Sequence, residues 1–161
     1  MHTNQTRIML KKQQRGFAAT PLLLLSALIL AVILFVVLSN RQASDGPVPV
    51  VWDKTPCAFC AMHLGDPRFA AQLSTEDGVT HFYDDPGCLF LHERELDLDP
   101  TTPVIHARWF RDLDSDGWIE AAEVAFRRCE DTPMDFGFGA VKNVGPETVS
   151  MEEAAAEVLA R

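Results

Sequence analysis

Acidic residues are missing from the first 40 positions of this chain. The same stretch holds four basic residues, Arg7, Lys11, Lys12 and Arg15, and then an apolar run from Phe17 to Leu38. A helix over that run would be roughly 33 Å long, enough to cross a bilayer core of about 30 Å. The absence of acid and the length of the run together predict a transmembrane helix.

Two further absences concern the removal of this segment. No pair of small residues has the spacing that a signal peptidase needs, because Arg41 stands where cleavage after Ala43 would require a small residue. No cysteine lies near the end of the run, so bacterial lipidation is not expected. We predict an uncleaved, single-pass signal anchor over residues 17–38 in the inner membrane. Residues 1–16 would form a cytoplasmic basic tail, which places the C-terminal part in the periplasm.

The part beyond the anchor has few basic residues. It contains all 23 acids but only ten of the 14 lysines and arginines, a formal charge of −13. Such a surface excludes binding to nucleic acid or to anionic lipid. It is typical of a solvated acidic surface that keeps an exported protein soluble.

Residues 39–50 are predicted to be a linker, because they contain Gly46, Pro47 and Pro49 and lack apolar periodicity. The globular domain is predicted over residues 51–161. Its length of roughly 110 residues allows one small core.

The first half of that domain predicts a hairpin followed by a helix. Strands are expected at Phe69–Ser74 and Val79–Tyr83, joined by a turn at Glu76–Gly78. A helix is expected over Pro86–Glu95, with Asp85 as its N-cap and the proline at its first position.

The second half repeats this order. Val104–Arg111 is expected to be a strand, Asp112–Gly117 a turn and Trp118–Ile119 a second strand. Glu120–Arg128 has a helical composition. The repeat indicates two ββα-type units.

A C-terminal helix completes the predicted fold. Ser150 and Glu153 form a capping box, and apolar residues follow at helical spacing: Met151, Ala155, Val158 and Leu159. The predicted class is α+β, with an N-terminal transmembrane helix, a small domain of two ββα-type units and a C-terminal helix.

The densest group of metal-binding residue types is the segment Cys57–His63. It contains two thiols, a thioether at Met62 and an imidazole. Soft sulfur donors select Cu(I) over harder cations. Two alternatives stay open: a disulfide between Cys57 and Cys60, and a packing role for Met62 in the core. His63 is a candidate additional ligand.

The other two cysteines favour structural roles. Cys88 begins a predicted helix among apolar neighbours, and Cys129 lies near the end of another. The four cysteines could form a four-thiolate zinc site or two disulfides, but their long, unequal gaps lack the two paired Cys-x-x-Cys motifs that would indicate zinc strongly.

The segment Asp112–Glu123 matches the calcium loop of an EF-hand at each ligand position. An EF-hand needs a helix before its loop, whereas Val104–Phe110 predicts a strand. The pattern therefore favours an acidic hairpin turn over a calcium site.

Four motifs in order resemble the NosL family, exported copper(I)-binding accessory proteins of nitrous-oxide reductase maturation. The first is Cys-x-x-Cys-x-Met near the start of the domain, and the second is the Asp-Asp-x-Gly-Cys helix start. The third is Trp-Ile-x-Ala, and the last is a Pro-Met followed by a glycine-rich aromatic strand. They lie at Cys57–Met62, Asp84–Cys88, Trp118–Ala121 and Pro133–Val141.

The resemblance implies a fold of two ββα-type units, similar to the central part of organomercurial lyase. It implies Cu(I) binding by Cys57, Cys60 and Met62 together with the late Met134. Two features depart from the family: members are commonly lipoproteins, and the usual glycine before the motif methionine is Ala61 here.

The sequence thus predicts a membrane-anchored, periplasm-facing Cu(I) metallochaperone that is not an enzyme. Its partner would be an apo cuproenzyme or the assembly proteins of one, with nitrous-oxide reductase as the example that the resemblance supplies. One alternative is an anchored thiol–disulfide oxidoreductase using Cys57 and Cys60, although Pro56 and a rapid break after the motif do not fit a thioredoxin-like helix. Another is an extracytoplasmic structural or sensor domain with a zinc or calcium site.

Overall fold

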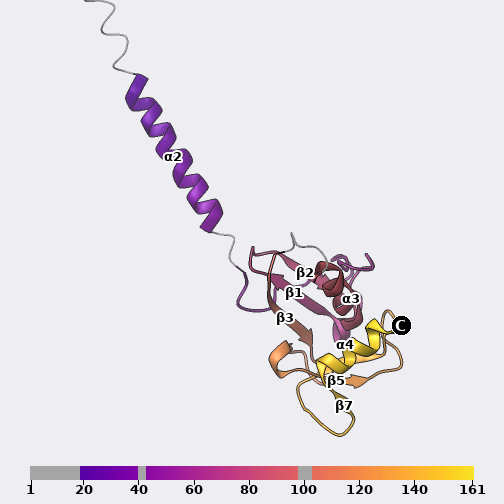
Figure 1. Cartoon of the computed structure of the whole chain (residues 1–161). Helices are drawn as coiled ribbons and strands as arrows, with labels where there is room; N and C mark the ends of the chain where they lie inside the picture. The colour runs from indigo at the N-terminus through magenta and orange to yellow at the C-terminus, as the bar shows by residue number, and fades with distance from the viewer. Residues whose placement is uncertain (1–18, 40–42, 98–102) are drawn as a thin grey trace, which may run out of the picture. The chain divides into compact units, whose positions relative to one another are not determined.

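The computed structural model of the chain describes residues 19–39, 43–97 and 103–161. The chain divides into two compact units, Met1–Arg41 and Gln42–Arg161. The first unit contains helix α2, Ala19–Ser39 (Figure 1). Among the described residues, no helix combines the length and the apolar character that crossing a membrane requires.

The first of two sheets is antiparallel, with strand order β2-β1-β3-β4. Its strands are β1 Ala71–Thr75, β2 Thr80–Tyr83, β3 Ile105–Arg111 and β4 Trp118–Glu120. The predicted first hairpin is confirmed, with Gly78 at a φ of 85° in its turn. The start of its first strand was wrong, because Phe69 ends a short 3-10 turn, η1 Pro67–Phe69.

Helix α3, Pro86–Asp97, follows β2 directly and confirms the predicted helix. The buried Asp85 accepts a hydrogen bond from the Gly87 backbone N–H at 2.8 Å, as an N-cap does. The corner between β2 and α3 is therefore held by a carboxylate inside the core.

The second sheet replaces a predicted helix. Its strands, in the order β6-β5-β7, are β5 Ala125–Arg128, β6 Phe138–Val141 and β7 Thr148–Val149. The helix predicted over Glu120–Arg128 was wrong, since only a 3-10 turn, η2 Ala121–Glu123, precedes β5. β5 is hydrogen-bonded to a strand on each side, and this pairing overrides a helical composition. The α+β class is confirmed, but of the two predicted ββα repeats only the earlier one, β1-β2-α3, is present.

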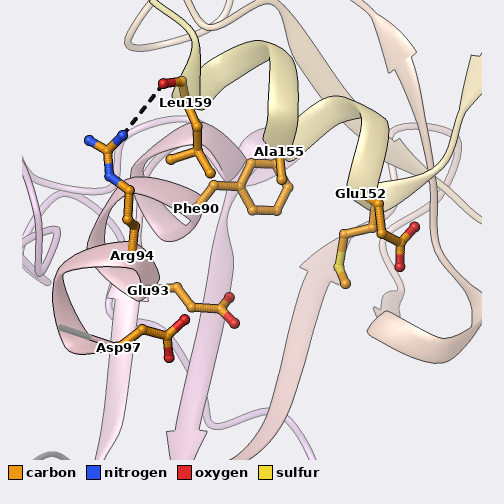
Figure 2. A pocket seen from close by; sticks show the side chains of 8 residues that line it. Phe90, Glu93, Arg94, Asp97, Glu152, Ala155 and Leu159 are labelled. Atoms are coloured by element: carbon orange, nitrogen blue, oxygen red, sulfur yellow. Dashed lines mark hydrogen bonds between the residues drawn. The ribbon is translucent and has the colours of Figure 1, made fainter. Parts of the chain in front are cut away.

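The last helix is α4, Met151–Leu159. It begins with the predicted capping box, in which the side chains of Ser150 and Glu153 each accept a hydrogen bond from the other residue's backbone N–H. It packs beside α3, and the two helices enclose a groove (Figure 2). Phe90, Ala155 and Leu159 line this groove, and Arg94 donates a hydrogen bond to the Leu159 carbonyl at 3.4 Å.

Three phenylalanines join helix α3 to both sheets. Phe90 of α3, Phe110 of β3 and Phe126 of β5 have ring centroids 5.2–6.2 Å apart. Tilted and edge-to-face contacts of this kind are favourable beyond the area that they bury. They fix α3, and hence its first turn, against the rest of the domain.

Candidate metal centre

The motif Cys57–His63 forms a tight loop. The Cys57 N–H donates to the Met62 carbonyl at 2.7 Å, and the Ala61 N–H donates to the Cys57 carbonyl at 3.1 Å. Ala61 closes the loop with a φ of 63°, in the left-handed region that non-glycine residues rarely adopt. The loop is attached to the first sheet by a hydrogen bond from the Ala58 N–H to the Phe82 carbonyl at 2.8 Å.

The corner between β2 and α3 supplies the other half of the centre. Asp84 ends the strand side of this corner and Cys88 lies in the first turn of α3. Both side chains are buried, at 2% and 0% exposure. Because Asp85 and Pro86 fix the start of α3, this corner holds the side chains of Asp84 and Cys88 close to the loop that contains Cys57 and Cys60.

One ligand atom from each of Cys57, Cys60, Asp84 and Cys88 lies within 4.8 Å of all the others. We call these four residues the thiol cluster. Cys57 is buried and Cys60 is half-buried, and all four cysteines of the chain are free thiols. The structure therefore brings together two of the predicted ligands, Cys57 and Cys60, with two residues that the sequence did not assign to the site.

Hydrogen bonds and burial within the thiol cluster give the three thiols different pKa values. The Cys88 thiol donates to Cys57, which lowers the pKa of Cys57 from 9.0 to about 6 despite its burial. The same hydrogen bond, followed by burial, raises the pKa of Cys88. Burial raises the pKa of Cys60 to about 11, and its thiol donates to the Asp84 carboxylate at 3.4 Å. These directions make Cys57 the first of the three thiols to ionise.

Such a group has the chemistry of a metal site. Three sulfurs suit Cu(I), which takes soft ligands in low coordination number. Three sulfurs and one carboxylate oxygen also satisfy tetrahedral Zn(II). In either case the bound metal would replace the thiol protons, so binding releases protons.

The predicted ligand Met62 lies at the edge of the site. Its side chain is 51% exposed, and it lines a pocket that also includes His63 and Asp84. Its carbonyl accepts the Cys57 N–H, so the backbone of Met62 closes the loop that carries two thiols of the cluster.

Met134 is connected to the site through the backbone. It is half-buried and packs against the core, and its N–H donates to the Asp85 carboxylate at 3.2 Å. Its neighbours Pro133 and Asp135 line the same pocket as Met62. Asp85 therefore links the Met134 loop to the start of α3.

Cys129 does not belong to the thiol cluster. Its sulfur lies 3.6 Å from the Arg127 carbonyl at the end of β5. It follows a strand, not the end of the helix that the sequence predicted.

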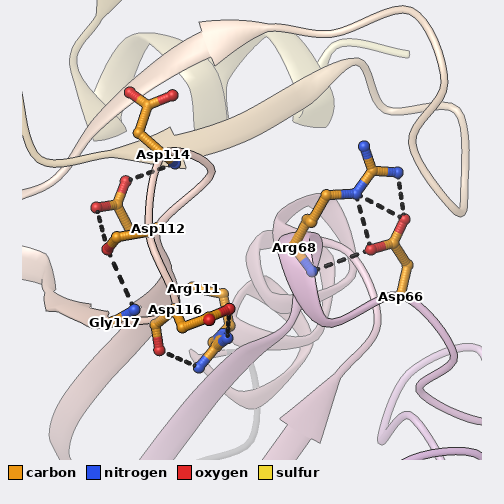
Figure 3. Close-up of polar contacts among 8 residues, drawn as sticks. Asp66, Arg68, Arg111, Asp112, Asp114, Asp116 and Gly117 are labelled. Atoms are coloured by element: carbon orange, nitrogen blue, oxygen red, sulfur yellow. Dashed lines mark hydrogen bonds and ion pairs between the residues drawn. The ribbon is translucent and has the colours of Figure 1, made fainter.

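The residues Asp112–Gly117 join strand β3 to strand β4, and the element directly before them is a strand, not a helix, so the predicted hairpin turn is confirmed (Figure 3). Cationic side chains already pair with carboxylates of the Asp112–Glu123 segment. These pairs are Asp114 with Arg127 at 2.8 Å, Asp116 with Arg111 at 3.4 Å and Glu123 with Lys142 at 2.9 Å. A calcium ion would have to displace these cations.

Comparison of the chain with models of protein families, with curated proteins and with solved structures returns no match. The functional argument therefore rests on the residues of this chain.

Proposed function

We propose that the chain is a membrane-anchored copper(I) metallochaperone whose C-terminal domain faces the periplasm and delivers copper to an apo cuproenzyme. One observation carries the proposal: three thiols and a carboxylate converge within 4.8 Å. Met62, an exposed soft donor of another kind, lines the pocket that also includes Asp84 of this group. A metal carried in such a site is cargo, and the chain needs no catalytic activity.

The choice of Cu(I) over Zn(II) follows from the sulfur donors. Zinc accepts a set of three thiolates and a carboxylate, but it rarely uses thioethers. Cu(I) uses both thiolates and thioethers. The exposed Met62 and the half-buried Met134 therefore favour copper as the cargo.

The acceptor is proposed from the resemblance to the NosL family, whose members serve nitrous-oxide reductase maturation. In this chain the resemblance covers the loop with Cys57, Cys60 and Met62 and the helix start with Cys88. An apo cuproenzyme or its assembly proteins would then receive the copper, with nitrous-oxide reductase as the first to test.

The membrane anchor rests on the sequence alone. The run Phe17–Leu38 is preceded by four basic residues and by no acid. Positively charged flanks remain cytoplasmic, which directs the domain to the periplasm.

The test is an anaerobic Cu(I) titration of the reduced chain against a competing chelator, repeated in the presence of Zn(II). We expect one tightly bound Cu(I) that equimolar Zn(II) does not displace. Cys88→Ala should weaken binding at least tenfold, whereas Cys129→Ala, which removes a thiol outside the thiol cluster, should leave it unchanged. Displacement by Zn(II), or equal effects of the two variants, would contradict the proposal.

A thiol–disulfide oxidoreductase is the second candidate, favoured by the low pKa of Cys57 beside the protonated Cys60. A redox nucleophile must be reachable, and Cys57 is 3% exposed. A disulfide-reduction assay separates the two functions. Turnover that disappears in Cys57→Ser, in a chain that does not bind Cu(I), would favour the oxidoreductase.

A further inference from the structure

A pocket of about 420 Å³ opens beside the thiol cluster and shares Asp84 with it. Its walls come from two loops that are distant in the sequence, residues 62–66 and residues 130–135. We call this cavity the exchange pocket. The first loop continues from the cysteine motif, and the second is linked to α3 through the hydrogen bond between Met134 and Asp85.

The donor atoms of the exchange pocket are more accessible than those of the thiol cluster. Met62 is 51% exposed and His63 is also exposed. Cys57, Asp84 and Cys88 are all buried. A ligand atom from another protein can therefore meet the thioether and the imidazole without entering the core.

The exchange pocket is strongly acidic. Five carboxylates line it and no lysine or arginine does; they belong to Asp66, Asp84, Glu130, Asp131 and Asp135. Two arginines lie nearby. Arg68 is paired with Asp66 at 2.6 Å, and the Arg161 guanidinium donates to the Asp135 carbonyl at 2.7 Å.

The exposed carboxylates of Glu130, Asp131 and Asp135 leave an excess of negative charge over those two arginines. None of the three forms an ion pair with a cationic side chain within 4.0 Å in the part of the chain that the structure describes. They remain available to a partner.

We propose that the exchange pocket is the docking surface for a cationic segment of the protein that exchanges Cu(I) with this chain, and that this segment carries a thioether or imidazole ligand. The copper part rests on the proposed function, whereas the docking part rests on the charges and shape of the pocket. Complementary charge speeds encounter, orients the partner and excludes anionic proteins. Docking here would bring the partner's ligand beside Met62.

The test uses two synthetic peptides with the same Met-x-x-Met core, one flanked by lysines and one by glutamates. Binding of each dye-labelled peptide to the reduced, metal-free full chain is measured by fluorescence anisotropy at low and high salt. We expect the lysine peptide alone to bind, and salt to weaken it because the charges are exposed. In Glu130→Gln with Asp131→Asn, its affinity should fall about fivefold or more.

The matched control removes the same charge elsewhere. Glu76→Gln with Glu147→Gln neutralises two exposed carboxylates outside the exchange pocket. Equal weakening in both double variants, or no binding of the lysine peptide, would overturn the proposal. Because the assay contains no metal, its result is independent of the copper titration, so failure of docking and failure of copper binding are distinguishable.

Discussion

At the scale of single residues, the thiol cluster depends on where each proton is held. Cys57 accepts a hydrogen bond from Cys88, which lowers its pKa and favours its ionised form, while the Cys60 thiol donates a hydrogen bond to Asp84. A metal ion that enters this group finds one ligand already ionised. Only the remaining thiols must lose protons on binding.

The ionisation of Cys57 should appear as a pH dependence of stability. Its pKa is near 9.0 when unfolded and about 6 when folded. Between these values the unfolded chain holds a proton that the folded chain lacks, so the free energy of unfolding should rise with pH and be lost as pH falls through about 6. Denaturant unfolding of the reduced, metal-free chain, followed from about pH 7 to pH 8, measures this slope. At higher pH the unfolded Cys60, Cys88 and Cys129 thiols lose protons that their raised pKa values retain in the folded chain, which opposes the rise.

Two variants identify the source of that slope. Cys57→Ser should abolish it, and Cys88→Ala should flatten it because the hydrogen bond that lowers the pKa is lost. Burial lowers the pKa values of His81 and His92 below their usual 6.5. These two histidines therefore change stability mainly at lower pH, outside the range of the measurement. An unchanged slope in Cys57→Ser would show that another group titrates.

Met134 can be tested as ligand or as packing residue by Met134→Leu. Leucine preserves volume and hydrophobicity, so the free energy of unfolding should change by less than about 1.5 kcal/mol. Leucine has no donor atom, so Cu(I) affinity should fall if the thioether is a ligand. We expect weaker copper binding with a nearly unchanged melting temperature of the metal-free chain; unchanged affinity would assign Met134 to the core.

Half of the thiol cluster could be predicted from sequence. Cys57 and Cys60 are close along the chain, so their proximity needs no tertiary information. Asp84 and Cys88 join them only because the loop bonds to β2 through Ala58. The apolar neighbours of Cys88 correctly indicated burial, but burial and metal binding are compatible.

At the scale of elements, the start of α3 is in tight contact with the loop before β6. A Cβ on Gly87 would lie 2.3 Å from the ring of Phe136. Gly87 therefore permits the approach of that loop, which also carries Met134. The same corner holds the Asp85 carboxylate and Cys88.

Gly87→Ala should therefore destabilise the domain and disturb the thiol cluster. Overpacking of this kind typically costs about 1–3 kcal/mol, and it should also displace Cys88 and weaken Cu(I) binding. Thermal unfolding and copper titration measure the two effects. Gly145→Ala is the control, because nothing lies within 4 Å of its added Cβ, and it should change stability by less than about 0.5 kcal/mol. If the two variants behaved alike, the close contact between Gly87 and Phe136 would not be needed for stability or for copper binding.

Local signals predicted several elements and failed at others, most clearly at β5. The Asp-Gly turn, the capping box at Ser150 and the proline at the start of α3 each act within a few residues, and each was found. β5 was missed because its strand conformation depends on β6 and β7, which follow it in the chain. Whether such a segment forms a strand depends on its neighbouring strands, so its own residues give only a weak signal.

At the scale of the whole molecule, the placement of the domain can be tested directly. A reporter that is active only outside the cytoplasm, fused after Arg161, should be active, and the chain should stay with the membrane fraction after cell lysis. Replacing Arg7, Lys11, Lys12 and Arg15 by glutamine should reduce reporter activity, since basic flanks set orientation. Recovery of the domain in the soluble periplasmic fraction would contradict a retained anchor.

Ala61 has a consequence for the release of cargo. A left-handed alanine lies roughly 1–2 kcal/mol above its ordinary conformation, and the closed loop that carries Cys57 and Cys60 has Ala61 in that state. Opening the loop recovers this energy, and about 1.4 kcal/mol corresponds to a tenfold change in an equilibrium constant. If metal binding requires the closed loop, backbone torsion at this one residue would oppose retention of a metal and favour its transfer, as the proposed carrier function requires.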